Sequence, residues 1–230
     1  RSSARELKRF VAKVKRATGA RKVDLVGHSE GTIVPQWYIK FLGGKKHVKR
    51  FVGIASAFKG TNIPTPFYAL LGQILPGGEL PTVCVSCLQF APASPFMKKL
   101  HEGGMLAKGV DYTSIVTKYD ELVLPYTNGT MKGVRNIVLQ DVCKEDWSEH
   151  FQIVSSRNVA QIVLNRLDPK RKKPITCQLL SELGAVDERG NLLHMGKELS
   201  RLPLDPRVGR MIVEARERGA LAEVLIIASA

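Results

Sequence analysis

Residues 23–35 read VDLVGHSEGTIVP and pass from an apolar run, typical of a buried strand, directly into a helical pattern. The turn between the two, GHSEG at residues 27–31, sets a glycine two residues to either side of Ser29. Glycine and serine are common at such turns for conformational reasons alone. The same turn is also required where a strained backbone lifts a serine hydroxyl off the edge of a sheet for nucleophilic attack. The rest of the chain must decide between these two interpretations.

The two glycines of this turn have a steric reason in the nucleophile interpretation. We expect the strand and the helix to come too close at Gly27 and Gly31 for a side chain at either position. The N–H groups at the start of the following helix would also help to stabilise an oxyanion. The string itself is short and weakly specific, so its support comes from the strand before it and the helix after it.

Helical and strand patterns alternate from residue 1 to residue 169. The helical patterns span residues 3–18, 32–42, 94–103 and 156–169. The strand patterns span residues 23–26, 48–57, 112–120 and 134–142. Between them, residues 59–95 are rich in glycine and proline and have no strong periodicity. This alternation predicts an α/β sheet.

A serine nucleophile requires a base and an acid that orients the base. On sheets with such an elbow, the acid follows the serine along the chain and the histidine follows the acid. Asp120 ends a predicted strand, and His150 lies in the loop after the next predicted strand, so this pair satisfies both order and position. His101 precedes Asp120, and His47 lies in a basic turn. Without a catalytic role, Asp120 would be an ordinary carboxylate at the end of a strand and His150 an ordinary histidine in a surface loop. The occurrence of both together with the elbow favours the catalytic interpretation.

The chain carries a formal net charge of +14, and 44% of its residues are hydrophobic, so a sizeable core is possible. A polyanion partner would suit such a charge, but the charge is scattered along the chain. Its one dense block, residues 170–173, is more typical of a solvated linker. No signal peptide or apolar run long enough to span a bilayer is present. Because the chain begins at Arg1, inside a helical pattern, we expect its true amino terminus to be missing.

The cysteines leave several alternatives open. Cys84 and Cys87 form a C-x-x-C pair, which is compatible with a redox site, half a zinc site or a local disulfide. The pair follows a loop rather than a strand, and Cys143 and Cys177 do not form the second close pair that a zinc site needs. A structural disulfide is therefore favoured, and Cys143 has either one of this pair or a cysteine upstream of residue 1 as its candidate partner.

Several separated segments closely resemble the class 2 triacylglycerol lipases. They are GHSEGTIVPQWYIKFLGG, CVSC, DYTSIVTKYDELVLPYTNG, NIVLQDVC and HFQIVSSRNVAQIVLNRLDP, in that order, between about residue 5 and residue 169. The resemblance implies a secreted α/β-hydrolase that cleaves carboxylic esters of lipids or small molecules without a metal or cofactor. It implies Ser29 as nucleophile, Asp120 as orienting acid and His150 as base. It also supports a disulfide role for Cys84 and Cys87.

The resemblance also implies that one part of the oxyanion hole is missing from this sequence. In α/β-hydrolases one oxyanion donor is the N–H of the residue after the nucleophile, here Glu30, and the other comes from a loop after an earlier strand. The elements that carry that loop are expected before residue 1, so the sheet is predicted to lack its N-terminal strands. Loss of one oxyanion donor costs about 10² to 10³ in rate. The strand at residues 23–26 is then expected to be an apolar edge of the sheet.

The end of the chain differs from the rest in composition and in its pattern of apolar residues. Residues 170–174 are predicted to be a basic linker, and residues 175–230 a small, mostly helical unit. The stretch QLLSELGAVDERGNLLHMGKELSRLPLDPRVGRMIVEARERGALAEVLIIASA is similar to the helicase-associated region of DEAH-type RNA helicases, where a winged helix ends and a helical bundle begins. That similarity implies a weak contact with nucleic acid, but the sequence contains no G-x-x-x-x-G-K-[ST] phosphate loop for a motor.

Two functions follow from these two parts. The first is a serine ester hydrolase, and the alternative is a non-catalytic nucleic-acid-associated module that carries a lipase fragment as a passenger. A secreted lipase joined to part of an intracellular helicase is physically incongruous. We therefore expect that the chain joins fragments of two unrelated genes.

Overall fold

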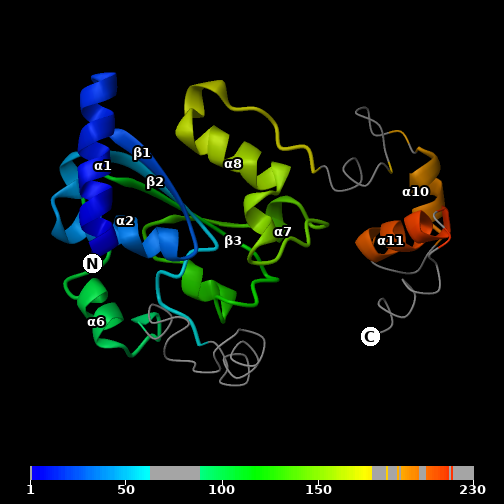
Figure 1. Ribbon diagram of the computed structural model, residues 1–230, viewed down its shortest axis with the longest axis horizontal. Coiled ribbons are helices and arrows are strands. Elements are labelled where there is room, and N and C mark those ends of the chain that lie inside the picture. Colours follow the sequence, from blue (N-terminus) through cyan, green and yellow to red (C-terminus); the bar gives the residue numbers. More distant parts are fainter. Residues whose placement is uncertain are drawn as a thin grey trace. The chain divides into compact units, whose positions relative to one another are not determined.

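The computed structural model describes residues 2–62, 89–177, 185, 191, 193–201, 206–217 and 219 (Figure 1). The chain forms two compact units, Arg1–Ile175 and Thr176–Ala230, and each is described by itself. Cys84 and Cys87 lie outside the described residues.

The first unit is built on a parallel sheet. In the described part of the chain the sheet has four strands in the order β1 (Val23–His28), β2 (Val48–Ile54), β3 (Asp111–Val116) and β4 (Arg135–Val138). All neighbouring strands pair in parallel. Parallel strands are usually buried on both faces, which accounts for the apolar runs that predicted them. The α/β fold expected from the sequence is confirmed.

Helices cover both faces of this sheet (Figure 1). Buried apolar residues of α1 (Ser2–Thr18), α2 (Glu30–Phe41) and α6 (Pro95–His101), such as Val11, Tyr38 and Leu100, belong to one apolar cluster. Val159 and Ile162 of α8 (Arg157–Leu167) belong to a second cluster. The sheet therefore lies between two helical layers.

Strand β2 shows how the two clusters are separated. Its Phe51 packs in the cluster of α1 and α2, whereas Val52 and Ile54 pack in the cluster of α8. Successive side chains of a strand point to opposite faces, so this alternation places the two clusters on the two sides of the sheet.

Local sequence signals set the starts of two helices. The Ser94 hydroxyl accepts a hydrogen bond from the Met97 N–H at 3.1 Å, and Pro95 occupies the first turn of α6. The Ser156 hydroxyl accepts one from the Val159 N–H in α8 at 3.3 Å. Both are the N-cap contacts that serine makes at helix starts.

Several predicted boundaries were wrong, and strand β2, for example, ends at Ile54 and not at residue 57. Helix α2 begins at Glu30, directly after the elbow serine, and not at residue 32. Strand β3 ends at Val116, so Asp120 lies in a turn beyond the strand and not at its end. The predicted strand at residues 134–142 is only half extended, because α7 (Leu139–Val142) follows β4 directly. The buried side chain of Gln140 bonds to groups outside the sheet, which requires the chain to turn there.

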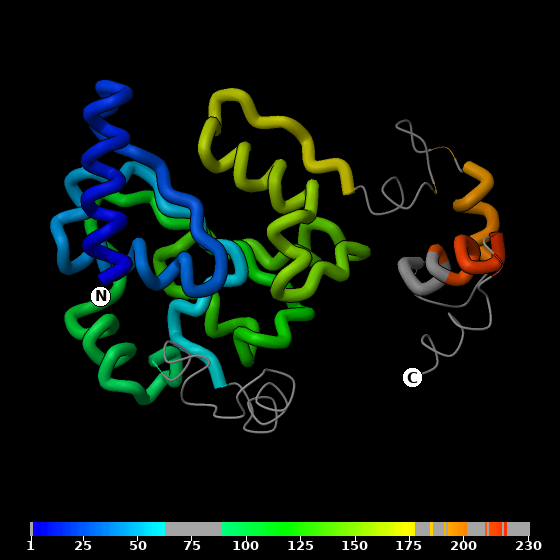
Figure 2. Tube along the Cα trace, viewed as in Figure 1, coloured from blue at the N-terminus to red at the C-terminus, as the bar shows by residue number. Residues whose placement is uncertain are grey.

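Short 3₁₀ turns connect the larger elements of the first unit. They are η1 (Gly44–Lys46), η2 (Tyr126–Gly129), η3 (Gln152–Val154) and η4 (Pro169–Arg171). Figure 2 follows the chain through these connections. The basic segment after residue 169 belongs to the first unit, since the Asn165 side chain donates to the Lys173 carbonyl at 2.8 Å and accepts from its N–H at 2.9 Å.

The second unit contains α10 (His194–Leu199) and α11 (Pro206–Glu217). Leu199, Val213 and Ala185 form a small buried cluster. Glu198 forms an ion pair with Arg216, with a distance of 2.9 Å between the guanidinium nitrogen and the carboxylate oxygen. The helical character expected of this part is present in the described residues.

None of the helices in the described ranges combines the length and the apolar character needed to cross a membrane.

The division into two units generates a prediction about folding. A chain that ends after residue 178 is expected to keep the near-UV circular dichroism of the first unit and a single cooperative thermal transition, because the four described strands and the helices on both faces of the sheet all belong to that unit. Thermal unfolding of the full and shortened chains measures this. Loss of the near-UV signal in the shortened chain would show that the first unit depends on the second.

Candidate active site

The elbow holds Ser29 in a strained conformation between β1 and α2. Its φ is 53° and its ψ is −120°. A non-glycine residue in such a conformation costs about 1 to 3 kcal/mol, so the surroundings must enforce it. The Ser29 N–H donates to the Ile54 carbonyl at the end of β2 at 3.0 Å. The Ser29 carbonyl accepts from the Thr32 hydroxyl at 2.6 Å and from the Thr32 N–H at 2.9 Å.

The two glycines of the elbow are not equivalent. A Cβ built at Gly27 would lie 1.9 Å from the Gly31 carbonyl oxygen, so no side chain fits at Gly27. A Cβ at Gly31 would meet nothing within 4 Å, so the predicted steric need for glycine at position 31 was wrong. The close contact is made by the Gly31 backbone. Pro35 stands four residues later in α2 and has no N–H to offer to that carbonyl.

The structure brings together three side chains that are far apart in the sequence. His150 is buried, with 1% of its surface exposed. Its Nε2 lies 2.9 Å from the Ser29 hydroxyl oxygen, and its Nδ1 lies 2.9 Å from Oδ1 of Asp120. Because a carboxylate only accepts hydrogen bonds, Nδ1 carries the proton and Nε2 is left to accept from the Ser29 hydroxyl. Although Ser29 stands at the N-cap of α2, its hydroxyl makes no cap bond to the helix.

Backbone groups fix the Asp120 carboxylate. The side chain is buried, and its Oδ1 accepts from the Val123 N–H at 2.7 Å and from the Leu122 N–H at 3.0 Å, besides His150. These bonds compensate for burial of the carboxylate and keep it aimed at the imidazole.

A buried polar network ties the turn that carries Asp120 to the loop that carries His150. The Thr117 hydroxyl, just beyond β3, donates to the Ser148 carbonyl at 2.7 Å and accepts from the Gln140 amide at 2.9 Å. The Gln140 amide also donates to the Asp146 carbonyl at 2.7 Å. No sequence pattern identifies these residues, because their role depends on a turn, helix α7 and a loop meeting in space.

Asp146 organises the His150 loop from within. Its carboxylate accepts from the Ser148 hydroxyl at 2.6 Å, the Ser156 hydroxyl at 2.7 Å and the Asn158 amide at 2.8 Å. Burial by itself would raise the pKa of Asp146, but the hydrogen bonds from Ser148, Asn158 and Ser156 outweigh it and hold the pKa below its usual value. The loop is therefore stabilised by an ionised carboxylate.

Two glutamates hold the backbone on either side of His150. The Glu121 carboxylate accepts from the His150 N–H at 3.0 Å, and Glu149 accepts from the N–H groups of Phe151 and Gln152 at 2.8 and 2.9 Å. Partial burial and a hydrogen bond to Glu149 raise the pKa of Glu121. Burial opposes ionisation of Glu149, but these backbone donors lower its pKa on balance. Glu121 is thus the member of the pair that retains a proton more readily.

His28, the residue before the serine, also contacts His150. Its Nε2 donates to the His150 carbonyl at 2.8 Å, and the two ring centroids are 4.8 Å apart. Burial lowers the pKa of His28 below its ordinary value, so the ring is neutral at neutral pH. His28 was not among the predicted site residues, although its position inside the elbow places it beside the serine.

Exposed aromatic side chains occur around these loops. Tyr119 and Trp147 stack with ring centroids 4.8 Å apart, and each is about 40% exposed. Phe151 meets the His150 ring edge-on at 5.3 Å and is 64% exposed. Phe151 thus adds exposed apolar surface next to His150, and the stacked pair lies on the two chain segments that carry Asp120 and His150.

The remaining predicted site residues have the following places. The Glu30 N–H, the expected oxyanion donor, lies in the first turn of α2. Cys143 is disulfide-bonded, and so is Cys177, which had not been proposed for a disulfide. The Nε2 of His101 donates to the Phe58 carbonyl at 2.8 Å, and His47 contacts Lys15, so neither histidine belongs to the triad.

The arrangement of Ser29, His150 and Asp120 is suited to one kind of chemistry. A neutral imidazole hydrogen-bonded to a serine hydroxyl can take the hydroxyl proton as the oxygen attacks an electrophilic carbon. The carboxylate behind the imidazole stabilises the positive charge that forms. Their catalytic roles stay a prediction.

Three comparisons with known proteins bear on this site. The family model described as Lipase (class 2) matches residues 2–163. Among solved structures, Aspergillus fumigatus lipase B is similar with a TM-score of 0.58 and 18% identity, over 76% of this chain and 42% of that chain. The mature form of Bacillus licheniformis lipase BlEst2 is similar with a TM-score of 0.54 and 16% identity, over 72% of each chain. At such identities the structures show the fold alone.

A second similarity is to helicases. The chain is 47% identical over 58 residues to the ATP-dependent RNA helicase HrpA of Escherichia coli and 40% identical over 53 residues to a putative ATP-dependent RNA helicase of Schizosaccharomyces pombe. Each match covers 23% of this chain and only 4% of the helicase. The chain is thus similar to a small part of these proteins.

The Asp146 network generates a stability prediction. Asp146→Ala is expected to lower the free energy of unfolding at pH 7 by about 3 kcal/mol, because it leaves several buried donors unsatisfied. The folded-state pKa of Asp146 is lowered, so its stabilisation is present above the unfolded-state pKa of about 3.9 and is lost as the pH falls through the folded-state value. The difference in the free energy of unfolding between the unmodified protein and Asp146→Ala should therefore become smaller below about pH 4.

Chemical denaturation at several pH values measures this difference. Asp141→Ala is the matched control, since Asp141 makes an exposed ion pair with Lys118 at 2.8 Å and should contribute at most about 1 kcal/mol. Equal effects of the two substitutions would contradict the role given to Asp146.

Proposed function

Because the chain belongs to the class 2 lipase family, we propose that its first unit is a carboxylic-ester hydrolase with Ser29 as nucleophile, His150 as base and Asp120 as orienting acid. The observation that carries this proposal is the continuous relay of hydrogen bonds from the Ser29 hydroxyl through His150 to Asp120, each 2.9 Å long.

The proposed reaction has two steps. The Ser29 oxygen attacks the ester carbonyl carbon while its proton passes to Nε2 of His150. The resulting imidazolium then gives that proton to the departing alcohol, which leaves an acyl group on Ser29. Water attacks the acyl group in the second step, again with His150 as base, and releases the acid.

Two neighbouring groups would favour the charged states of this reaction. The N–H groups in the first turn of α2, that of Glu30 included, would stabilise the negative oxygen of the tetrahedral intermediate. His28 is neutral at neutral pH, so it adds no positive charge next to the imidazolium that forms on His150.

The acyl group of the substrate is proposed to be apolar. The support is the exposed aromatic surface of Tyr119, Trp147 and Phe151 beside the triad. Such a surface favours acylglycerols or short-chain esters over charged esters, because contact with an acyl chain removes apolar area from water. Secretion of the protein remains a proposal that rests on the likeness to lipases alone.

The second unit is proposed to make at most a weak contact with nucleic acid. The support is the similarity of a short stretch to RNA helicases. The alternative function, a nucleic-acid-associated module without catalysis, predicts a folded protein that binds single-stranded RNA and hydrolyses no ester. The assay described next distinguishes the two.

Replacement of the nucleophile gives the direct test. Ser29→Ala is expected to lower the rate of p-nitrophenyl butyrate hydrolysis at least about 10³-fold, since the residual rate comes from binding groups alone. Ser155→Ala is the control, because Ser155 is exposed and its hydroxyl, among the described residues, bonds only to the Gln152 carbonyl. Equal rates for Ser29→Ala and the unmodified protein would remove Ser29 as nucleophile.

His28 is expected to position His150. His28→Phe removes the donor to the His150 carbonyl but keeps a ring of similar shape, and should lower kcat about tenfold with little change in KM. His28→Gln retains a donor and should recover most of the rate. Thermal unfolding of both variants serves as the control for stability. If kcat falls equally in His28→Phe and His28→Gln, the hydrogen bond from His28 to the His150 carbonyl does not position His150.

A further inference from the structure

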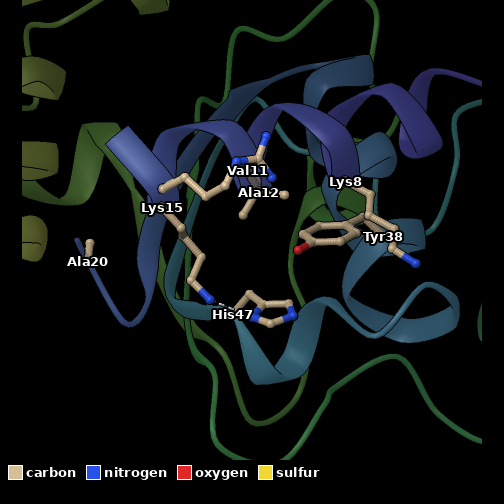
Figure 3. A pocket seen from close by; sticks show the side chains of 8 residues that line it. Lys8, Val11, Ala12, Lys15, Ala20, Tyr38 and His47 are labelled. Carbon is tan, nitrogen blue, oxygen red and sulfur yellow. Dashed lines mark hydrogen bonds between the residues drawn. The ribbon is translucent and has the colours of Figure 1, made fainter. Parts of the chain in front are cut away.

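The first unit contains a cavity of about 360 Å³ between α1, α2 and the turn at η1 (Figure 3). It has the size of a site for a small organic ligand. Ser29, Asp120 and His150 are not among its lining residues. Its lining residues are Lys8, Val11, Ala12, Lys15, Arg16, Ala20, Tyr38 and His47.

The wall of this cavity combines apolar and cationic groups. Val11, Ala12 and the Tyr38 ring supply apolar surface, while Lys8, Lys15 and Arg16 lie on the same helix, α1. The lining contains no carboxylate. In the described part of the chain, neither Lys8 nor Arg16 forms an ion pair with an acidic side chain. The cavity therefore concentrates uncompensated positive charge next to an apolar wall.

Lys15 is held by a neutral partner. Its Nζ donates to Nδ1 of His47 at 2.8 Å (Figure 3). Burial lowers the pKa of His47, and the positive charges of Lys15, Lys46 and Lys8 lower it further. His47 thus orients the Lys15 ammonium group without neutralising it, and leaves that group able to pair with an anion.

Tyr38 adds a hydrogen-bond donor. Only 1% of this residue is exposed, and its hydroxyl points into the cavity (Figure 3). Among the described residues the hydroxyl has no hydrogen-bond partner. Burial raises the pKa of Tyr38, so the phenol keeps its proton and can donate it in a hydrogen bond. The hydroxyl is thus a donor that a ligand in the cavity can use.

We propose that this cavity binds an amphipathic carboxylate, of the kind that a fatty acid presents, with its head group at Lys15 and the Tyr38 hydroxyl (Figure 3). The Lys15 ammonium group neutralises the carboxylate, the phenol donates to it, and Val11, Ala12 and the Tyr38 ring cover the first carbons of the chain. The apolar wall distinguishes this ligand from a simple inorganic anion. The inference does not depend on the role of Ser29.

Calorimetric titration of the full chain with octanoate, below its micelle concentration, tests the proposal. Lys15→Met keeps the length of the side chain and removes its charge, and should weaken binding about tenfold or more. Tyr38→Phe keeps the ring and should weaken binding severalfold. Lys13→Met is the matched control, because Lys13 lies on the same helix, is exposed and does not line the cavity. It should bind octanoate as the unmodified protein does.

Two further probes separate the contributions of charge and chain. Octanol and inorganic phosphate should each bind at least about tenfold more weakly than octanoate, since one lacks the charge and the other the chain. Equal binding of octanol would overturn the role of the lysines, and equal binding of phosphate would overturn the role of the apolar wall.

The location of the bound anion has its own measurement. A carboxylate in the cavity offsets the charge of the lysines, so the pKa of His47 measured by NMR should rise when octanoate is added. A pKa of His47 that stays unchanged at saturating octanoate, or equal affinities of Lys15→Met and Lys13→Met, would show that octanoate binds elsewhere and would overturn the proposal.

Discussion

The contact between Gly27 and the carbonyl of Gly31 is the constraint on which the site depends. It lets α2 begin immediately after β1, with a single residue, Ser29, between them. Any side chain at Gly27 would push the helix away from the strand. The N–H of Ser29 is at the same time fixed to the Ile54 carbonyl at the end of β2. The strained serine conformation is thus enforced by the sheet on one side and the helix on the other, and the hydroxyl is left free of helix capping.

The histidine and the acid reach this hydroxyl through a different kind of interaction. They lie on loops, and loops have no periodic hydrogen bonds of their own to fix their positions. Thr117, Gln140 and Asp146 supply those bonds, since they join the two loops through buried side-chain contacts. These bonds stabilise the loops because an unpaired buried polar group is costly. The geometry of the triad therefore depends on residues that do not touch a substrate.

The effect of the basic residues depends on where they lie in the structure and not only on the net charge. Most basic residues are scattered over the surface, where single charges contribute little. At the cavity beside α1, however, Lys8, Lys15 and Arg16 gather where the lining has no carboxylate and the wall is apolar. The net charge of +14 does not distinguish these two situations. The distinction arises from the packing of α1 against α2, which brings Tyr38 and His47 to the same place.

The sequence by itself determined the local structure: the helices from their apolar periodicity and caps, the strands from their apolar runs, and the elbow at Ser29 from its turn residues. It also predicted the order of acid and histidine, because chain order follows from the architecture. Only the tertiary structure decided that residues 139–142 leave the sheet, that His28 contacts the backbone of His150, and that Lys15 and His47 share a cavity wall. These features are contacts between segments distant in the chain, and such contacts have no periodicity or turn chemistry that a single sequence displays.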